Sequence, residues 1–263
     1  MEQKKLRTLI LNEKQNVLRI ILNRPDKMNA LNADMYAELN SVLDKVEINP
    51  ACRVLIITGS GRAFCAGGDI SELSRASATL EGAQARLRMS HRLALRLRGL
   101  KQPIIMAVNG AAVGAGFSLA LNGDLIVASK TARFGATFLR VGLTPDMGSI
   151  HNLVHLLGSA KACELAFMAD IVDAEEAEKS GLVNRVVEPD KLNELADEWA
   201  KKMARLPFLA LSLLKKAIYK AQDMNFESEI EDEINLQSLC LLSKDGREGL
   251  TAFLERRVPS FNC

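Results

Sequence analysis

The chain has 263 residues, of which 48% are hydrophobic and 25% charged, and its formal net charge at pH 7 is +2. This length can bury a large core, and the composition is that of an ordinary globular protein. There is no apolar run long enough to span a membrane, no apolar signal-peptide segment near the N-terminus and no block of like charge. We therefore expect neither a membrane nor a nucleic acid as partner.

Cysteines and histidines bear on compartment and metal binding. The five cysteines are odd in number and lack CxxC spacing, which predicts reduced thiols and a cytoplasmic location. His151 and His155 are four residues apart on an expected helix, a spacing that suits a metal ion, but no Glu or Cys accompanies them. An ordinary helix face is the favoured interpretation, and we expect no metal site.

Strands and helices alternate in the first part of the chain. Residues 6–11 and 17–22 are expected to form a hairpin around the polar segment Asn12–Asn16. The β-branched run Val54–Thr58 predicts a strand that is buried on both faces. The arginines of the helical segment Leu80–Leu100 are expected in solvent or, alternatively, against phosphate. Further elements are expected at 33–46 (helix, N-cap Asn32) and 104–108 (strand).

The segment after Gly148 is predominantly helical. Only Val183–Val187 looks extended there. We expect an α/β core at 1–190 and a helical C-terminal region at 191–263, whose long apolar faces suggest burial against other subunits. The expected helices are 150–157, 160–168, 174–180, 192–206, 208–221, 226–242 and 247–256.

Two stretches rich in small residues follow expected strands. The first is Ala63–Ile70, and the second, Val113–Gly116, leads into the apolar helical segment Phe117–Leu121. A helix N-terminus without large side chains leaves backbone N–H groups open to a developing negative oxygen. Small residues also allow tight packing of strand against helix, which the local sequence alone favours, and the first stretch is open to interpretation as a flexible connection.

Taken together, five spaced motifs resemble the crotonase superfamily, the enoyl-CoA hydratase/isomerase family. The motifs are NRPDKMNAL at 23–31, AFCAGGDI at 63–70, AVNGAAVGAG at 107–116, FGATFLRVGLTPDMG at 134–148 and AFLERRVPSF at 252–261. The resemblance covers essentially the whole chain in the family's order. It implies a spiral of ββα turns with a helical trimerisation region, and assembly as a trimer or a hexamer. It also implies acyl-CoA thioesters as substrates, with coenzyme A as part of the substrate and no separate cofactor.

The resemblance further implies a set of site residues. The amides of Gly68 and Ala115 would hold an enolate oxygen. The segment Met28–Ala30, together with Ala66, Asp69 and Ile70, would line the path of the adenine and pantetheine groups. Arg24 and Arg256 would meet phosphate, the latter across a subunit boundary, although plain surface solvation is an equal alternative for both arginines.

The acids that decide the reaction differ from those of family hydratases. Where those hydratases carry two carboxylates, this chain has Ser118 and Phe138. The candidate acid is Asp146 in Thr144-Pro145-Asp146, which by local sequence also fits the N-cap and first turn of a helix. Phenylacetate-pathway isomerases resemble this chain in carrying a single Asp in this turn, and Phe138 would exclude water from it.

Four functions follow as hypotheses. The first is an acyl-CoA double-bond isomerase in which Asp146 carries the proton. The alternatives are an enoyl-CoA hydratase of low activity that uses a differently placed acid, and an acyl-CoA-binding protein without catalysis. A fourth is a dehalogenase that uses Asp146 as nucleophile and His91 as its helix histidine. The segment Ser71–Met89 is expected to shape the acyl pocket.

Overall fold

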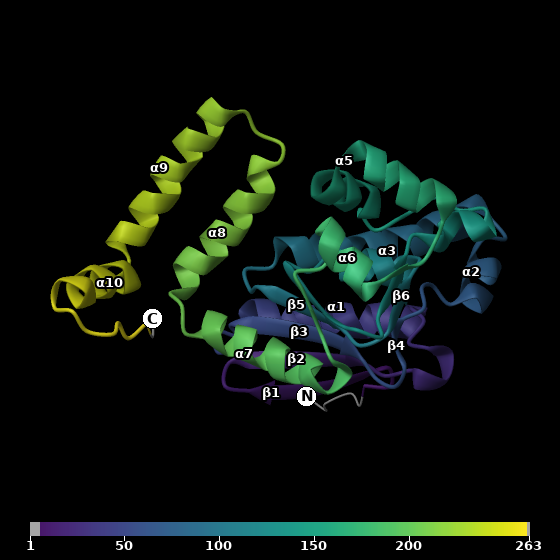
Figure 1. Cartoon of the computed structure of the whole chain (residues 1–263), viewed down its shortest axis with the longest axis horizontal. Helices are drawn as coiled ribbons and strands as arrows, with labels where there is room; N and C mark the ends of the chain where they lie inside the picture. Colours follow the sequence, from purple (N-terminus) through teal and green to yellow (C-terminus); the bar gives the residue numbers. More distant parts are fainter. Residues whose placement is uncertain (1–5, 262–263) are drawn as a thin grey trace.

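The computed structural model describes residues 6–261, which form two β-sheets surrounded by helices (Figure 1). The strands are β1 Leu9–Lys14, β2 Val17–Leu22, β3 Val54–Gly59, β4 Ala63–Cys65, β5 Ile104–Val108, β6 Ala111–Val113, β7 Leu125–Ser129, β8 Arg133–Gly135, β9 Val172–Asp173 and β10 Arg185–Val187. The larger sheet has the order β1-β2-β3-β5-β7-β10 and is parallel except for the pair β1 and β2. The smaller sheet has the order β4-β6-β8-β9.

Successive strand pairs generate the architecture. In each of the pairs β3/β4, β5/β6 and β7/β8, the first strand joins the larger sheet and the second joins the smaller one, and a helical segment follows. This confirms the predicted spiral of ββα turns. The helices are α1 Ala33–Ile48, α2 Ile70–Ala76, α3 Leu80–Gly99, α4 Ala115–Ala120, α5 Ser149–Met168, α6 Ala174–Ser180, α7 Leu192–Ala204, α8 Phe208–Ala221, α9 Phe226–Leu242 and α10 Lys244–Leu254, with 3-10 turns η1 Pro25–Lys27, η2 Thr137–Val141 and η3 Pro189–Lys191.

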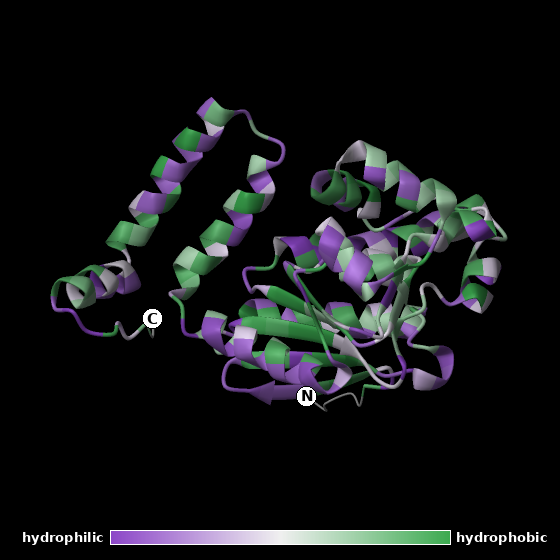
Figure 2. Ribbon diagram, viewed as in Figure 1, coloured by the Kyte–Doolittle hydropathy of each residue, from purple (hydrophilic) through white to green (hydrophobic). Residues whose placement is uncertain are grey.

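Strand β3 has the expected burial on both faces. Leu55 and Ile57 belong to the main core, whereas Val54 and Ile56 pack with α7 on the other side of the sheet. This alternation follows from the two-residue period of a strand. Figure 2 shows the consequence as hydrophobic central strands next to helix α7, whose visible face is largely hydrophilic. Helix α7 lies within the segment predicted as a C-terminal region, yet it covers the core sheet, and the boundary at residue 191 stays a prediction.

The first hairpin differs from its prediction. Strand β1 extends to Lys14, and only Gln15 and Asn16 form the turn, with φ of 51° and 66°. Such left-handed angles are typical of two-residue hairpin turns that match the twist of the strands. The predicted connection Asn12–Asn16 is therefore wrong in length. Its polar residues belong to an exposed edge strand, which tolerates them.

Helices α8, α9 and α10 extend away from the sheets (Figure 1). Buried Lys215 fixes α8 to the core, because its Nζ lies 2.8 Å from Asp124 Oδ2, while Tyr219 donates a 2.7 Å hydrogen bond to Asp124 Oδ1. Burial lowers the pKa of Lys215, and the Asp124 charge opposes that shift. Helix α9 carries apolar side chains that this chain leaves exposed, including Phe226 and Leu242. The oligomeric state stays a prediction.

Other features agree with the sequence. Helix α5 is interrupted at Gly158, which has a φ of 73°, and this matches the two separate helices expected over its length. Cys52, Cys65, Cys163 and Cys240 are free thiols. Cys263 lies outside the described residues. Within residues 6–261, none of the helices combines the length and the apolar character needed to cross a membrane.

Candidate active site

A cavity of about 630 Å³ lies between the end of β6 in the smaller sheet and helices α2 and α3. It is lined by the loop after β4, by α3, by the start of α4, by η2 and by residues 143–146. Gly68, Ala115, Phe138 and Asp146 all line it, so residues far apart in the sequence come together as the family resemblance implies. Ala66 and Ile70 line it as well.

The two small-residue stretches touch each other at one side of this cavity. A Cβ on Gly116 would collide with the carbonyl oxygen of Cys65, so the start of α4 can approach β4 only with glycine at that position. A Cβ on Gly67 would lie 3.6 Å from the Ala115 nitrogen, and Gly67 has a φ of 105° that favours glycine. The sequence allowed two interpretations of these small residues, tight packing of strand against helix and an open backbone at the start of the helix. The structure shows that the two occur together.

The backbone amides of Gly68 and Ala115 are both available in this region. Ala115 is the first residue of α4, and its N-cap Gly114 provides no side-chain acceptor. Neither amide donates a backbone hydrogen bond within the described part of the chain, and both residues line the cavity. A helix leaves its first N–H groups without internal partners, so these donors can serve a bound oxygen atom.

Asp146 lies in an irregular segment before α5. The helix begins only at Ser149, after Met147 and Gly148 adopt left-handed angles of 52° and 77°. The reading of Thr144 as the N-cap of this helix is therefore wrong. The Asp146 carbonyl accepts hydrogen bonds from Ser149 N at 3.0 Å and Ser149 Oγ at 2.8 Å, which holds this turn.

The Asp146 carboxyl is unusual in its surroundings. Its Oδ1 is buried without a hydrogen-bond partner among the residues the structure describes. Burial raises the pKa of Asp146, while the charges of His91 and Arg86 and a hydrogen bond from Ser118 oppose the rise. Among the described residues that line the cavity, Asp146 is the sole carboxylate. A desolvated carboxyl with a raised pKa suits a group that takes up and returns a proton.

Two further residues that line the cavity, Arg86 and Tyr36, were not predicted from the sequence. Arg86 is only 8% exposed, donates a 3.0 Å hydrogen bond from Nη2 to the Leu31 carbonyl, and lies with its guanidinium carbon 4.4 Å from the ring centroid of Tyr36. The expectation that the arginines of this helix face solvent or phosphate is wrong for Arg86. The sequence did contain a signal for the burial of Arg86. Residues 86, 90, 93 and 97 share one face of α3, and this face is buried.

Four residues expected along the coenzyme A path do not line the cavity: Arg24, Met28, Ala30 and Asp69. Arg24 instead forms a 2.9 Å ion pair with Asp69 and donates to the Ala30 carbonyl, which ties this loop to the start of α2. Hydrogen bonds from Ser71 and Arg24, with the Arg24 charge, lower the pKa of Asp69 to about 2. Phosphate binding by Arg24 stays a prediction.

Arg256 lies just after α10, and Figure 1 places α10 and α2 at opposite ends of the molecule. Within one chain it is thus remote from the cavity, and contact with phosphate across a subunit boundary stays a prediction. His91 does line the cavity, from α3. It lies close enough for its charge to affect the Asp146 carboxyl.

Comparison with known proteins identifies the family. The sequence model of the enoyl-CoA hydratase/isomerase family matches residues 12–263. The chain is 36% identical over 249 residues to the 1,2-epoxyphenylacetyl-CoA isomerase of Escherichia coli, covering 94% of this chain and 95% of the relative. It is 35% identical over 253 residues to the short-chain-enoyl-CoA hydratase of Clostridium acetobutylicum, covering 96% of each. The enoyl-CoA hydratase subunit I structure from Geobacillus kaustophilus superposes with a TM-score of 0.92 at 38% identity, covering 98% of each chain.

The chain therefore belongs to the enoyl-CoA hydratase/isomerase family, within the crotonase superfamily. Relatives of nearly equal similarity are named isomerase and hydratase, so overall identity does not choose between the two reactions.

Proposed function

We propose that this protein is an enoyl-CoA isomerase that shifts a double bond, with Asp146 as the single proton carrier. The observation that carries the proposal is the lone carboxylate: Asp146 is the only acid among the described residues lining the cavity. Addition of water to a double bond conventionally uses two carboxylates, whereas a shift of the bond needs one group that removes and returns the same proton.

The Asp146 carboxyl group is sufficient for both proton transfers of the proposed reaction. The Asp146 carboxylate takes a proton from the carbon next to the thioester carbonyl of a 3-enoyl-CoA, and the electron pair passes to the carbonyl oxygen. The Gly68 and Ala115 amides stabilise that negative oxygen. The enolate then reforms the carbonyl, the double bond moves into conjugation, and the neutral Asp146 acid donates its proton to the γ carbon. Phe138, 7% exposed on the cavity wall, limits access of water.

The proposal is tested with Asp146→Asn, which keeps the shape of the side chain and removes its base. Isomerisation of a 3-enoyl-CoA should fall by at least about 100-fold, the lower range for loss of a general base. Calorimetric binding of the acyl-CoA should persist, because the coenzyme path is intact. Turnover at the wild-type rate would remove Asp146 from the mechanism.

A hydratase is the second candidate, and the observation that favours it is His91 in the same cavity. His91 could supply the second acid or base that hydration needs, which makes it the differently placed group of the alternative hypothesis. Hydration of a 2-enoyl-CoA should then be measurable in the wild type and lost in His91→Gln. Under the isomerase proposal, the wild type gives no measurable hydration of a 2-enoyl-CoA, and His91→Gln still isomerises a 3-enoyl-CoA.

A further inference from the structure

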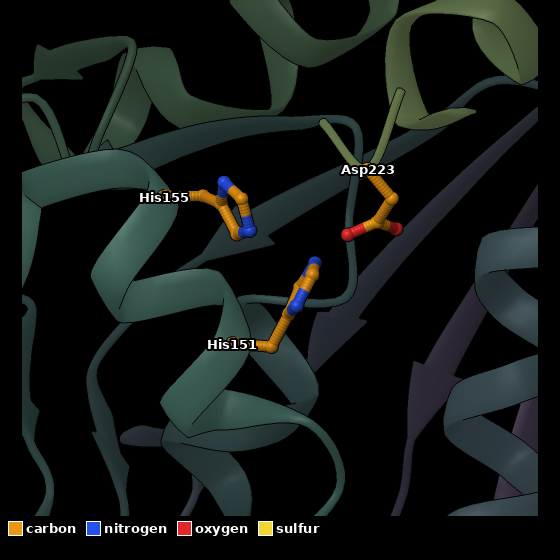
Figure 3. Close-up of side chains that lie close together, drawn as sticks. All are labelled: His151, His155 and Asp223. Carbon is orange, nitrogen blue, oxygen red and sulfur yellow. The ribbon is translucent and has the colours of Figure 1, made fainter. Parts of the chain in front are cut away.

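Helix α5 and the turn between α8 and α9 bring together three side chains that the proposed reaction does not use. His151 and His155 project from α5, and Asp223 faces them from the turn (Figure 3). One potential ligand atom from each of the three lies within 4.8 Å of the others. We propose that His151, His155 and Asp223 form a binding site for a divalent transition-metal ion of the Zn²⁺ class.

The donor set defines the class of ion. Two imidazole nitrogens and one carboxylate oxygen suit Zn²⁺, Co²⁺, Ni²⁺ or Cu²⁺, whereas Mg²⁺ and Ca²⁺ prefer oxygen ligands alone. Residues four apart on a helix share one face, so His151 and His155 present their rings to the same point. The sequence lacked a third ligand near these histidines, and folding supplies it as Asp223 from a distant turn.

The distances require only a modest closure. Bonds of about 2.0–2.2 Å from the ion to nitrogen and oxygen place tetrahedral ligand atoms about 3.3 Å apart. The present separations are all within 4.8 Å, and the two histidine ring centroids lie 4.2 Å apart with a 50° tilt. His155 and Asp223 are exposed, so their side chains can rotate inward without repacking a core, and water can fill the remaining coordination position.

His151 is the best held of the three ligands. Its Nε2 lies 3.1 Å from Arg98 Nη2 and 3.3 Å from Gln222 Oε1. Arg98 brings a competing positive charge, and an ion bound at Nε2 would take the lone pair that Arg98 now contacts. Arg98 would keep its other partners, since it also donates to Asn152 Oδ1 at 2.8 Å and lies 4.1 Å over the Tyr219 ring.

The position of the site gives the ion a structural consequence. It would connect α5 with the turn that follows α8, next to the place where the Lys215 and Asp124 pair already fixes α8 to the core. An ion that binds the folded chain and not the unfolded chain raises the melting temperature, and the rise grows with the logarithm of the free ion concentration once that exceeds the dissociation constant. The proposal therefore predicts both binding and stabilisation, and neither depends on the reaction in the cavity.

The test is a calorimetric titration of the metal-stripped full chain with ZnCl₂. Thiols also bind Zn²⁺, so Cys163, Cys240 and Cys263 are first replaced by serine. This background protein should bind one ion per chain and melt at a higher temperature when Zn²⁺ is added. Both effects should disappear in His155→Gln and in Asp223→Asn.

Two matched controls remove groups of the same kind elsewhere. His91→Gln changes the cavity histidine, and Asp170→Asn changes an aspartate whose side chain is 75% exposed. Both variants should bind Zn²⁺ as the background protein does. Absence of saturable binding in the background protein would overturn the proposal, and so would binding that survives His155→Gln and Asp223→Asn.

Discussion

Replacing Ala115 by proline would remove one amide hydrogen from the candidate site while leaving the helix its proper start. Ala115 is the first residue of α4, a position where proline is tolerated because the N–H has no helical acceptor. Within residues 6–261 this amide donates to no backbone acceptor, so no structural hydrogen bond is lost. The preceding Gly114 has no Cβ to meet the proline ring, and its φ of 54° and ψ of −129° lie outside the helical region that proline disfavours there.

The expected loss is that of one oxyanion donor, about 100- to 1,000-fold in kcat, or about 2.7–4 kcal/mol of transition-state stabilisation. The assay is steady-state isomerisation of a 3-enoyl-CoA, with circular dichroism and thermal melting to show that the variant is folded. The control is Ala115→Gly, which keeps the amide and removes only the methyl group, and which should keep turnover close to wild type. A folded Ala115→Pro protein with wild-type kcat would refute the role of this amide.

Three further predictions concern the same cavity. Arg86→Met removes a positive charge that lowers the pKa of Asp146, so that pKa should rise further and the acid limb of the kcat/KM profile should move to higher pH; an unmoved limb would contradict the assignment. Because the folded-state pKa of Asp146 is raised above its ordinary 3.8, ionisation destabilises the fold, and Asp146→Asn should melt at the wild-type temperature at low pH but above it at pH 8. Equal melting of both proteins at pH 8 would count against a desolvated carboxylate. Gly116→Ala should cost about 1–3 kcal/mol of stability, because its methyl group meets the Cys65 carbonyl, whereas Gly68→Ala meets nothing within 4 Å and should leave melting almost unchanged.

The pattern of apolar residues along the sequence predicted the helices and strands whose buried residues follow that pattern. Helix α1 was found because its apolar residues recur at helical spacing, and strand β3 because its continuous β-branched run indicates burial on both faces. Strand β1 was misplaced because an exposed edge carries polar residues that resemble a loop. The strands β4, β6 and β8 have three residues each, which is too short for any period to be visible.

The residues of the candidate site were likewise predicted only in part. The family resemblance grouped Gly68, Ala115 and Asp146, and they do line one cavity. Arg86 was missed because burial of a charged side chain depends on its tertiary partners, here the Leu31 carbonyl and the Tyr36 ring. Asp223 could not be placed beside His151 from sequence, because only the docking of α8 on the core brings that turn to α5.

The close contact between Gly116 and the Cys65 carbonyl affects which substitutions during evolution can change the reaction in this cavity. The contact joins two backbone segments directly, so substitutions at 118, 138 or 146 can alter acids and apolar walls without displacing the amides of Gly68 and Ala115. Backbone donors are also indifferent to which side chain their own residue carries. The fold therefore separates a constant part, which can hold a negative oxygen, from a variable part, which decides where a proton goes.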